Sequence, residues 1–294
     1  MTAPSIPLAA MAKRARPRGR RTSITLQPVT LPAMQATNLY QAAYAPIVDI
    51  WTGAQAAVME EYERTLREAA TADSGALTVD SAASIEAQIE RALTAASSVI
   101  VTIRPKLGAW GRIAEAWHRR RWQATVQTAT GLDLSTMIGP EDARETLDAV
   151  IARNVGLVRS VSDDARQRIA TAVYEGLQAR TPSREVAQEI AEGVDIARRR
   201  ALRIAAHQNV VLSSQLNEER RRQAGIDAWV WVHSLKAHPR EDHKARDGNL
   251  YSDNPDRVGT FYEGKTVMEP PPSDDLPGMR PNCGCTSRSV LILD

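Results

Sequence analysis

Residues 195–232 read DIARRRALRIAAHQNVVLSSQLNEERRRQAGIDAWVWV and contain the point at which the chain changes from helix to strand. If residues 195–223 are continuously helical, they form a rod of about 43 Å, and Gly225 ends it. Residues 228–232 then alternate Trp with Ala and Val, so both faces of this segment are apolar. This pattern predicts a strand that is buried on both sides. We therefore place a domain boundary near residue 226.

Helical periodicity dominates the sequence before this stretch. Residues 39–71, 81–101 and 107–128 each place apolar side chains on one helical face, and three more helical segments follow. Ser162 is expected to cap one of these segments, and a short helix is expected to end near Gly193 before the long one begins. Aromatic residues make up only 4% of the chain, so Ala, Leu, Ile and Val must build its core. This favours packed helices.

The predicted fold class is mainly α, with an extended helical N-terminal body followed by a small α+β C-terminal module with few strands. Pro28 and Pro32 interrupt residues 22–38 and predict an extended arm there, whereas residues 290–293 predict a terminal strand. The chain divides into a basic, Pro-containing extended arm (1–38), a helical region (39–140), a second helical region (141–225) and the C-terminal module (226–294). The last segment has few apolar residues in its middle, so a metal or a partner surface would help to stabilise it.

The composition excludes several classes of protein. With 294 residues, 43% hydrophobic and 24% charged, the chain has neither a collagen-like nor a disordered composition. No run approaches the roughly 18 apolar residues of a membrane span, and no secretory signal is expected at the N-terminus. Nucleotide hydrolysis and acyl transfer have no candidate residues, because the sequence holds no phosphate-binding glycine loop and no Gly-x-Ser-x-Gly turn.

Positive charge is concentrated in residues 1–40, which hold six basic residues and no acidic one. A basic, Pro- and Gly-containing segment of this kind suits a polyanion whose counterions it can release, so we predict that it binds nucleic acid. A solvated tail without a ligand is the alternative interpretation. The six predicted contact residues are Lys13, Arg14, Arg16, Arg18, Arg20 and Arg21.

A second basic cluster, residues 118–121, lies between Trp117 and Trp122. Tryptophans beside arginines can stack on and pair with nucleic acid. We favour the plainer interpretation, in which the tryptophans are core residues of a helix and the arginines are solvated.

The residues with the most versatile chemistry gather in the C-terminal module. They are His233, His238, Asp242, His243, Asp247, Cys283 and Cys285. Zinc prefers thiolate and imidazole, so His243, Cys283 and Cys285 are candidate zinc ligands, with His238 or Asp242 as the fourth. In the favoured alternative the cysteines pack as small apolar groups and His243 makes a hydrogen bond to a turn. The Cys-x-Cys spacing is too short for an unstrained disulfide, which leaves free thiols or metal ligands and fits a reducing compartment.

A series of motifs follows the Trp strand in a fixed order. They are Trp231, Arg240-x-x-His243, Gly248, Pro271, Pro277-Gly278 and Cys283-x-Cys285. This series resembles the C-terminal signature of the phage head morphogenesis family, the minor capsid proteins similar to protein F of phage Mu. The resemblance covers roughly residues 150–290 and includes Gly176-Leu177 and the helix at residues 200–205. The chain departs from the family pattern at Ala206-His207 and at an insertion around residues 253–265.

The resemblance implies a structural protein of a tailed phage with no enzymatic activity. Its implied role is that of a minor capsid protein in head assembly, close to the portal and the packaged double-stranded DNA. The implied partners are portal and capsid proteins and DNA bound without sequence preference, with no membrane, and a homo-oligomer is left open. The implied location is the virion, in the capsid interior or portal region, and the host cytoplasm before assembly. Residues 141–225 would then be the helical part of the head morphogenesis domain.

Two other functions are weighed against this one. The first is a metal-dependent, HNH-like nuclease in the His243/Cys283/Cys285 region, with Asp242 or Asp247 holding a divalent ion. It lacks the second block of ligands that such a nuclease needs after its cysteine pair. The second is a zinc-stapled interaction module without catalysis, which is compatible with a role in the phage head.

Overall fold

A computed structural model describes residues 6–15, 22–71, 79–262 and 264–293 of the chain. The chain divides into two compact units. The first comprises Met1–Ala36, Gly111–Val150 and Ala206–Asp294, and the second comprises Thr37–Trp110 and Ile151–Ala205. The predicted boundaries near residues 38, 140 and 225 stay predictions, since the compact units group these segments differently.

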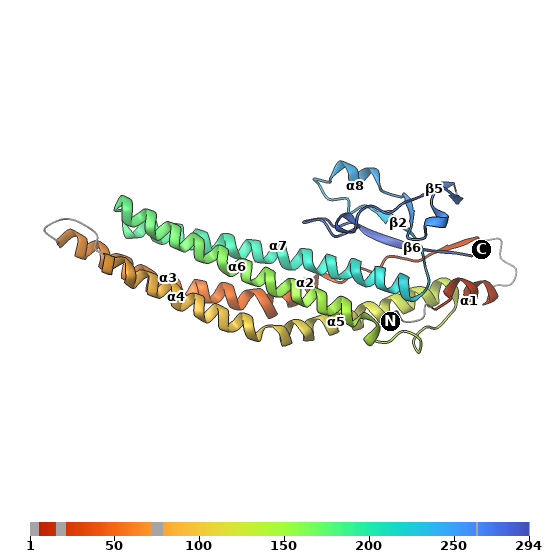
Figure 1. Cartoon of the computed structure of the whole chain (residues 1–294), viewed down its shortest axis with the longest axis horizontal. Coiled ribbons are helices and arrows are strands. Elements are labelled where there is room, and N and C mark those ends of the chain that lie inside the picture. Colours follow the sequence, from red (N-terminus) through yellow and green to blue (C-terminus); the bar gives the residue numbers. More distant parts are fainter. Residues whose placement is uncertain (1–5, 16–21, 72–78, 263, 294) are drawn as a thin grey trace. The chain divides into compact units, whose positions relative to one another are not determined.

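Most of the described residues are helical, and the predicted fold class is confirmed (Figure 1). The helices are α1 (Leu8–Ala15), α2 (Ala33–Leu39), α3 (Ala45–Thr71), α4 (Val79–Thr102), α5 (Arg104–Thr130), α6 (Arg144–Ala179), α7 (Ser183–Gln223) and α8 (Glu241–Ala245), and a π-helical turn (Tyr40–Tyr44) joins α2 to α3. None of the described helices is both long and apolar enough to span a membrane.

The second unit is held together by buried aromatic side chains of α3 and of the turn before it. Trp51 donates a hydrogen bond from its indole nitrogen to Ser162 Oγ at 3.0 Å, and the Tyr44 hydroxyl donates to Asn154 at 2.9 Å. All four residues are buried. These contacts satisfy polar groups inside an apolar interface, so they fix which residues of α3 and α6 face one another.

Two sequence predictions about α6 and α7 are wrong. Ser162 does not cap a helix, because α6 continues through it and its hydroxyl accepts the bond from Trp51. No helix ends at Gly193, since α7 runs unbroken from Ser183 to Gln223. At Gly193 an added Cβ would lie 3.0 Å from Arg168 Cβ. The glycine therefore serves a close approach between α6 and α7 rather than a helix end.

In the first unit, α5 and α7 share a buried ion pair. The Arg220 guanidinium contacts Glu115, and both side chains are almost fully buried. Next to this pair, His118 lies 3.1 Å from Asn217 Oδ1, and burial followed by the charge of Arg220 lowers the pKa of His118 to about 3. The imidazole is therefore neutral at physiological pH.

The basic cluster on α5 has a structural explanation. Trp122 is buried in the core and Trp117 is half-buried, whereas Arg120 and Arg121 are exposed and Arg119 is half-buried in an ion pair with Glu115. This arrangement agrees with the interpretation of core tryptophans and solvated arginines.

The C-terminal module is built on a six-stranded sheet. Its strands are β1 (Ser23–Thr25), β2 (Ala228–Val232), β3 (Leu250–Ser252), β4 (Phe261–Tyr262), β5 (Lys265–Met268) and β6 (Thr286–Ile292), in the spatial order β1-β6-β2-β3-β5-β4. The predicted Trp strand and terminal strand are confirmed as β2 and β6, which pair antiparallel with Trp231 opposite Ser287. One face of the sheet packs Ala228 and Val290, and the other packs both tryptophans, so β2 is buried on both sides.

The prediction of an extended arm at residues 1–38 is only partly correct. Residues 8–15 form α1, because Leu8 and Ala12 lie on one helical face and bury it in the core of the first unit. Ser23–Thr25 forms an edge strand paired with β6. Residues 26–32 are extended, as expected, but residues 33–38, which were also predicted to be extended, are helical because α2 begins directly after Pro32.

Polar side chains of α7 bind the backbone of this extended stretch. Asn217 donates to the carbonyl of Val29 at 2.7 Å, and the Leu31 amide donates to Ser213 Oγ at 3.1 Å. Asn209 donates to the carbonyl of Pro32 at 3.3 Å. Because a proline-containing segment cannot form a complete strand ladder, these buried side chains take the place of a paired strand.

Substitutions at two glycines of α6 test the helix packing in the second unit. At Gly176 an added Cβ would lie 2.6 Å from Val186 Cγ2 and 2.9 Å from the Tyr62 hydroxyl. We expect Gly176→Ala to lower the free energy of unfolding by about 1–3 kcal/mol through overpacking. Gly156 has open space around its Cα, so Gly156→Ala is the matched control. It should raise stability by about 0.5–1 kcal/mol through helix propensity alone. Thermal unfolding followed by circular dichroism measures both, and equal effects would contradict the packing.

Candidate functional site

His243, Cys283 and Cys285 converge in the C-terminal module. The Nδ1 atom of His243 lies 3.4 Å from Cys283 Sγ and 3.9 Å from Cys285 Sγ. One donor atom from each of the three residues lies within 4.8 Å of the others. All three side chains are buried, and both cysteines are free thiols. The structure therefore brings together three of the four residues that the sequence suggests as zinc ligands.

Two loops are tied together to form this cluster. Arg240, just before α8, donates to the carbonyl of Pro281 at 3.0 Å, and Lys236 donates to the carbonyl of Asn282 at 2.8 Å. The backbone at Gly284 lies close to the loop after β2, because a Cβ there would lie 3.0 Å from Ser234 Cβ and 2.8 Å from the flexible end of Lys236. The Arg-x-x-His and Cys-Gly-Cys motifs thus depend on each other through backbone contacts.

Asp275 holds the imidazole from its other side. Its Oδ1 atom lies 2.9 Å from His243 Nε2, and its two oxygens accept hydrogen bonds from Arg246 and Arg280, both at 2.8 Å. Burial raises the pKa of Asp275, but the hydrogen bonds from His243 and Arg246 and the arginine charges outweigh it, so the net pKa is lowered. An ionised carboxylate favours the tautomer with its proton on Nε2, which turns the Nδ1 lone pair toward the two sulfurs.

Aromatic rings form one wall of the site. Trp231 meets the His243 ring edge-on, with ring centroids 5.1 Å apart. The Arg246 guanidinium lies over the Trp231 ring, 5.2 Å from its centroid. Trp229 stacks on Tyr251 at 4.7 Å in the same cluster. Since the imidazole is fixed by packing as well as by hydrogen bonds, its orientation is well determined.

N–H groups are directed at both sulfurs. The Cys285 amide donates to Cys283 Sγ at 3.4 Å. The pKa of Cys283 is lowered, first by a hydrogen bond from the Cys285 thiol and then by backbone N–H groups that include that of Gly278. The pKa of Cys285 is raised, first by its hydrogen bond to Cys283 and then by burial. A single negative charge is therefore favoured on Cys283 while the second proton is shared within the pair.

The family model for phage Mu protein F like proteins matches residues 167–288. The match confirms the resemblance over this Mu F-like segment, which runs from the middle of α6 into β6 and contains His243, Asp275, Cys283 and Cys285.

A relative described as an uncharacterized protein of Haemophilus influenzae is 25% identical over 178 residues. The alignment covers 60% of this chain and 37% of the relative, so the chain spans well under half of that protein. No solved structure matches the chain.

Of the other predicted site residues of the Mu F-like segment, Asp242 lies beside the cluster, where one of its carboxylate oxygens, a ring nitrogen of His243 and a carboxylate oxygen of Asp275 all lie within 4.8 Å of one another. His238 and Asp242 are exposed, and neither belongs to the His243, Cys283 and Cys285 group. Asp247 accepts a hydrogen bond from the His233 amide, and His233 Nδ1 accepts one from the Leu235 amide, so both side chains stabilise the loop after β2.

The predicted nucleic-acid contacts lie partly inside the described chain. Lys13 and Arg14 are exposed on α1. Arg16, Arg18, Arg20 and Arg21 lie outside the described residues.

Asp275 is the site residue that the sequence analysis missed. It lies 32 positions after His243 in a Pro- and acid-rich stretch, where no periodic pattern relates it to the imidazole. The available signal was chemical, because a buried histidine that faces thiols needs an acceptor on its second nitrogen.

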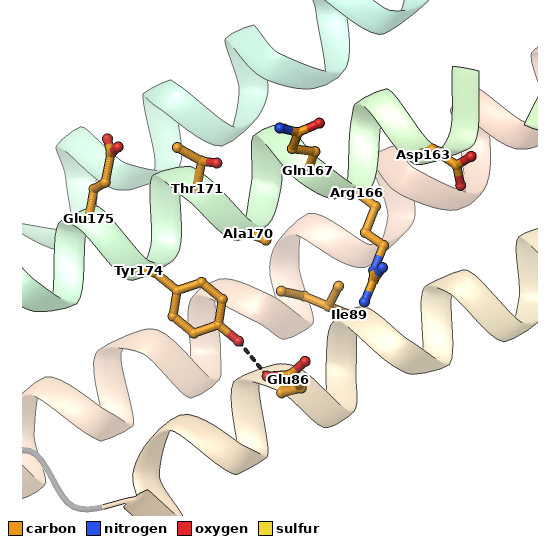
Figure 2. A pocket seen from close by; sticks show the side chains of 9 residues that line it. All are labelled: Glu86, Ile89, Asp163, Arg166, Gln167, Ala170, Thr171, Tyr174 and Glu175. Carbon is orange, nitrogen blue, oxygen red and sulfur yellow. Dashed lines mark hydrogen bonds between the residues drawn. The ribbon is translucent and has the colours of Figure 1, made fainter. Parts of the chain in front are cut away.

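The second unit contains an open cleft of about 650 Å³ between α4 and α6 (Figure 2). Tyr174 donates to Glu86 at 2.6 Å across it, and Arg166 pairs with Glu90, also at 2.6 Å. Burial and then the hydrogen bond with Glu86 raise the pKa of Tyr174 to about 12, so the phenol stays a donor at neutral pH. These contacts join two helices, and the cleft brings together no nucleophile and base among its described side chains.

Asp275→Asn tests the charge network of the site. Removing this buried charge leaves Arg246 and Arg280 without their shared carboxylate, so we expect the free energy of unfolding to fall by about 3 kcal/mol. The neighbouring Asp274 is exposed, and its carboxylate comes no closer than 3.8 Å to the Arg280 guanidinium. Asp274→Asn should therefore change stability by less than about 0.5 kcal/mol. Denaturant unfolding measures both variants, and a small effect of Asp275→Asn would show that the network is not stabilising.

Proposed function

We propose that this chain is a minor capsid protein of a tailed phage, with a structural role in head assembly. The observation that carries the proposal is the match of residues 167–288 to the phage Mu protein F like family. The segment contains the whole His/Cys cluster and the contacts that hold it. The match therefore covers the site and its supporting contacts, not an isolated motif.

The geometry of His243 supports a structural role over the nuclease alternative. A general base must reach a water molecule and its substrate. His243 is 1% exposed, its Nε2 faces Asp275 and its Nδ1 faces the two thiols. Of the carboxylates proposed to hold a divalent ion, Asp247 is engaged with the loop backbone, whereas the exposed Asp242 lies near His243 and Asp275, whose ring and carboxylate already bind each other. In this arrangement the imidazole supports the fold of the module.

The proposed partners follow from this role. The C-terminal module would dock on portal or capsid proteins, and the protein would lie in the capsid interior or portal region after a period in the host cytoplasm. The basic N-terminal segment would contact the backbone of packaged double-stranded DNA without reading its sequence. The core of the first unit anchors this segment through Leu8 and Ala12.

Mass spectrometry of purified particles and their precursors tests the proposal. We expect the full-length chain in both, in fewer copies than the major capsid protein. A chain with Asp275→Asn should be depleted from particles, whereas Asp274→Asn should be incorporated normally. If the protein were absent from particles and precursors and free in the infected cell, the proposal would be wrong.

The salt dependence of DNA binding tests the N-terminal segment. Deleting the segment would also remove the packing of Leu8, so the sharper variant replaces its six basic residues with Gln. Because each phosphate contact contributes about −0.9 to the slope of log K against log salt, the slope should become shallower by up to about 5. A matched control replaces six exposed basic residues of the described helices: Arg67, Arg91, Arg104, Lys106, Arg112 and Arg203. Fluorescence anisotropy at several salt concentrations measures the slopes. Equal slopes in both variants would show that the N-terminal segment does not contact DNA phosphates.

A further inference from the structure

The distances within the His/Cys cluster match those of a metal site. In a tetrahedral zinc site the Zn–S bonds are about 2.3 Å and the Zn–N bonds about 2.0–2.1 Å, so sulfur and nitrogen lie about 3.6 Å apart. The two observed sulfur–nitrogen distances, 3.4 Å and 3.9 Å, lie on either side of this value. Two of the three distances between donor atoms thus fit one zinc ion, and all three donor atoms lie within 4.8 Å of one another.

We propose that His243, Cys283 and Cys285 bind a single zinc ion, with a solvent molecule as the fourth ligand. His238, the fourth ligand suggested by the sequence, is exposed and lies outside the group. Asp275 would orient His243 toward the ion, since it accepts a hydrogen bond from Nε2, the ring nitrogen that does not face the sulfurs. The site does not depend on the proposed role in the phage head.

Charge balance supports the metal. Zinc binding would displace the proton that the cysteine pair shares, and the resulting two thiolates and neutral imidazole carry a charge of −2, which one Zn²⁺ neutralises inside a buried site. The charge of Asp275 is balanced separately, because Arg246 and Arg280 bind its two oxygens. Neither arginine reaches the sulfurs in the described contacts, so a bound cation is the partner that two thiolates at this position would need.

Two alternatives exist for the same contacts. As neutral thiols, the cysteines would place an S–H donor on the imidazole lone pair, Cys283 Sγ would accept from the Cys285 amide, and the pair would bind no metal. A disulfide across Cys-x-Cys would be strained. Hydrogen bonds from backbone N–H groups to sulfur stabilise thiolate character, which is the form that binds zinc.

A zinc ion here would join parts of the module that are distant in sequence. His243 lies on α8, whereas the cysteines precede β6, and about 40 residues separate them. The apolar cluster on this face contains only Trp229, Trp231, Tyr251 and the two cysteines as buried members. A small core of this kind gains stability when a metal closes a long loop.

Metal analysis of the full-length protein tests the proposal. The protein is purified without a polyhistidine tag, which would bind the same metals, and its zinc is measured by inductively coupled plasma mass spectrometry. We expect about one zinc per chain. Cys283→Ser and Cys285→Ser should each lose most of it, whereas the matched control His238→Gln should retain it. Full zinc loss in His238→Gln would overturn the ligand set.

Cobalt substitution tests the wild-type protein and does not depend on variants that fold. Co²⁺ bound by Cys283 and Cys285 should produce a thiolate-to-cobalt charge-transfer band. Removing the metal with a chelator should lower the melting temperature by roughly 5 °C or more. Asp275→Asn should weaken zinc affinity about 10–100-fold through the lost contact to His243. If Co²⁺ gives no such band and the chelator leaves the melting temperature unchanged, the zinc site is wrong. The particle experiment would still decide the role in the head.

Discussion

The carboxylate of Asp275 is the contact on which the C-terminal module depends. It accepts hydrogen bonds from one helix residue, His243, from Arg246 just after that helix, and from Arg280 in the loop that leads to the cysteines. The α8 segment, which carries His243 and Arg246, and the loop that carries Arg280 are thereby fixed at one buried point. The carboxylate also sets the imidazole tautomer, so the same contact that holds the fold determines which nitrogen faces the thiols. Fold and site are therefore consequences of one charge network.

The sheet explains why such a network is needed. Strand β2 is covered on both faces, but each face carries only a small set of apolar residues, with Ala228, Leu250 and Val267 on one and the tryptophans on the other. Residues 233–285 are largely loops and short elements, which bury little apolar surface. Polar contacts to backbone carbonyls, such as those of Arg240 and Lys236, supply part of the missing cohesion. Buried hydrogen bonds of this kind specify a unique arrangement because each group left without a partner would be costly.

Much of this architecture could be predicted from the sequence, and the failures have physical causes. Helix periodicity gave the long helices, and alternation gave the Trp strand, since both signals are local. Ser162 and Gly193 were misjudged because their roles are tertiary: one accepts a hydrogen bond from Trp51 and the other permits a close approach to Arg168. The cysteines and His243 could be grouped by residue type alone. The carboxylate that orients the imidazole could not, because the turn that presents it forms only in the folded module.

The polar residues of α7 show how the N-terminal segment is incorporated into the fold. Serine and asparagine in the middle of a helix are weak helix formers, and Ser213 and Asn217 would be poorly explained by helix stability alone. Their side chains bind the backbone of residues 29–31. The proline-containing stretch thus receives hydrogen bonds that neither a helix nor a sheet could give it. Its path leads on one side to β1 at the edge of the sheet and on the other to α2. A sequence that looks like an unstructured arm is in this way built into the first unit.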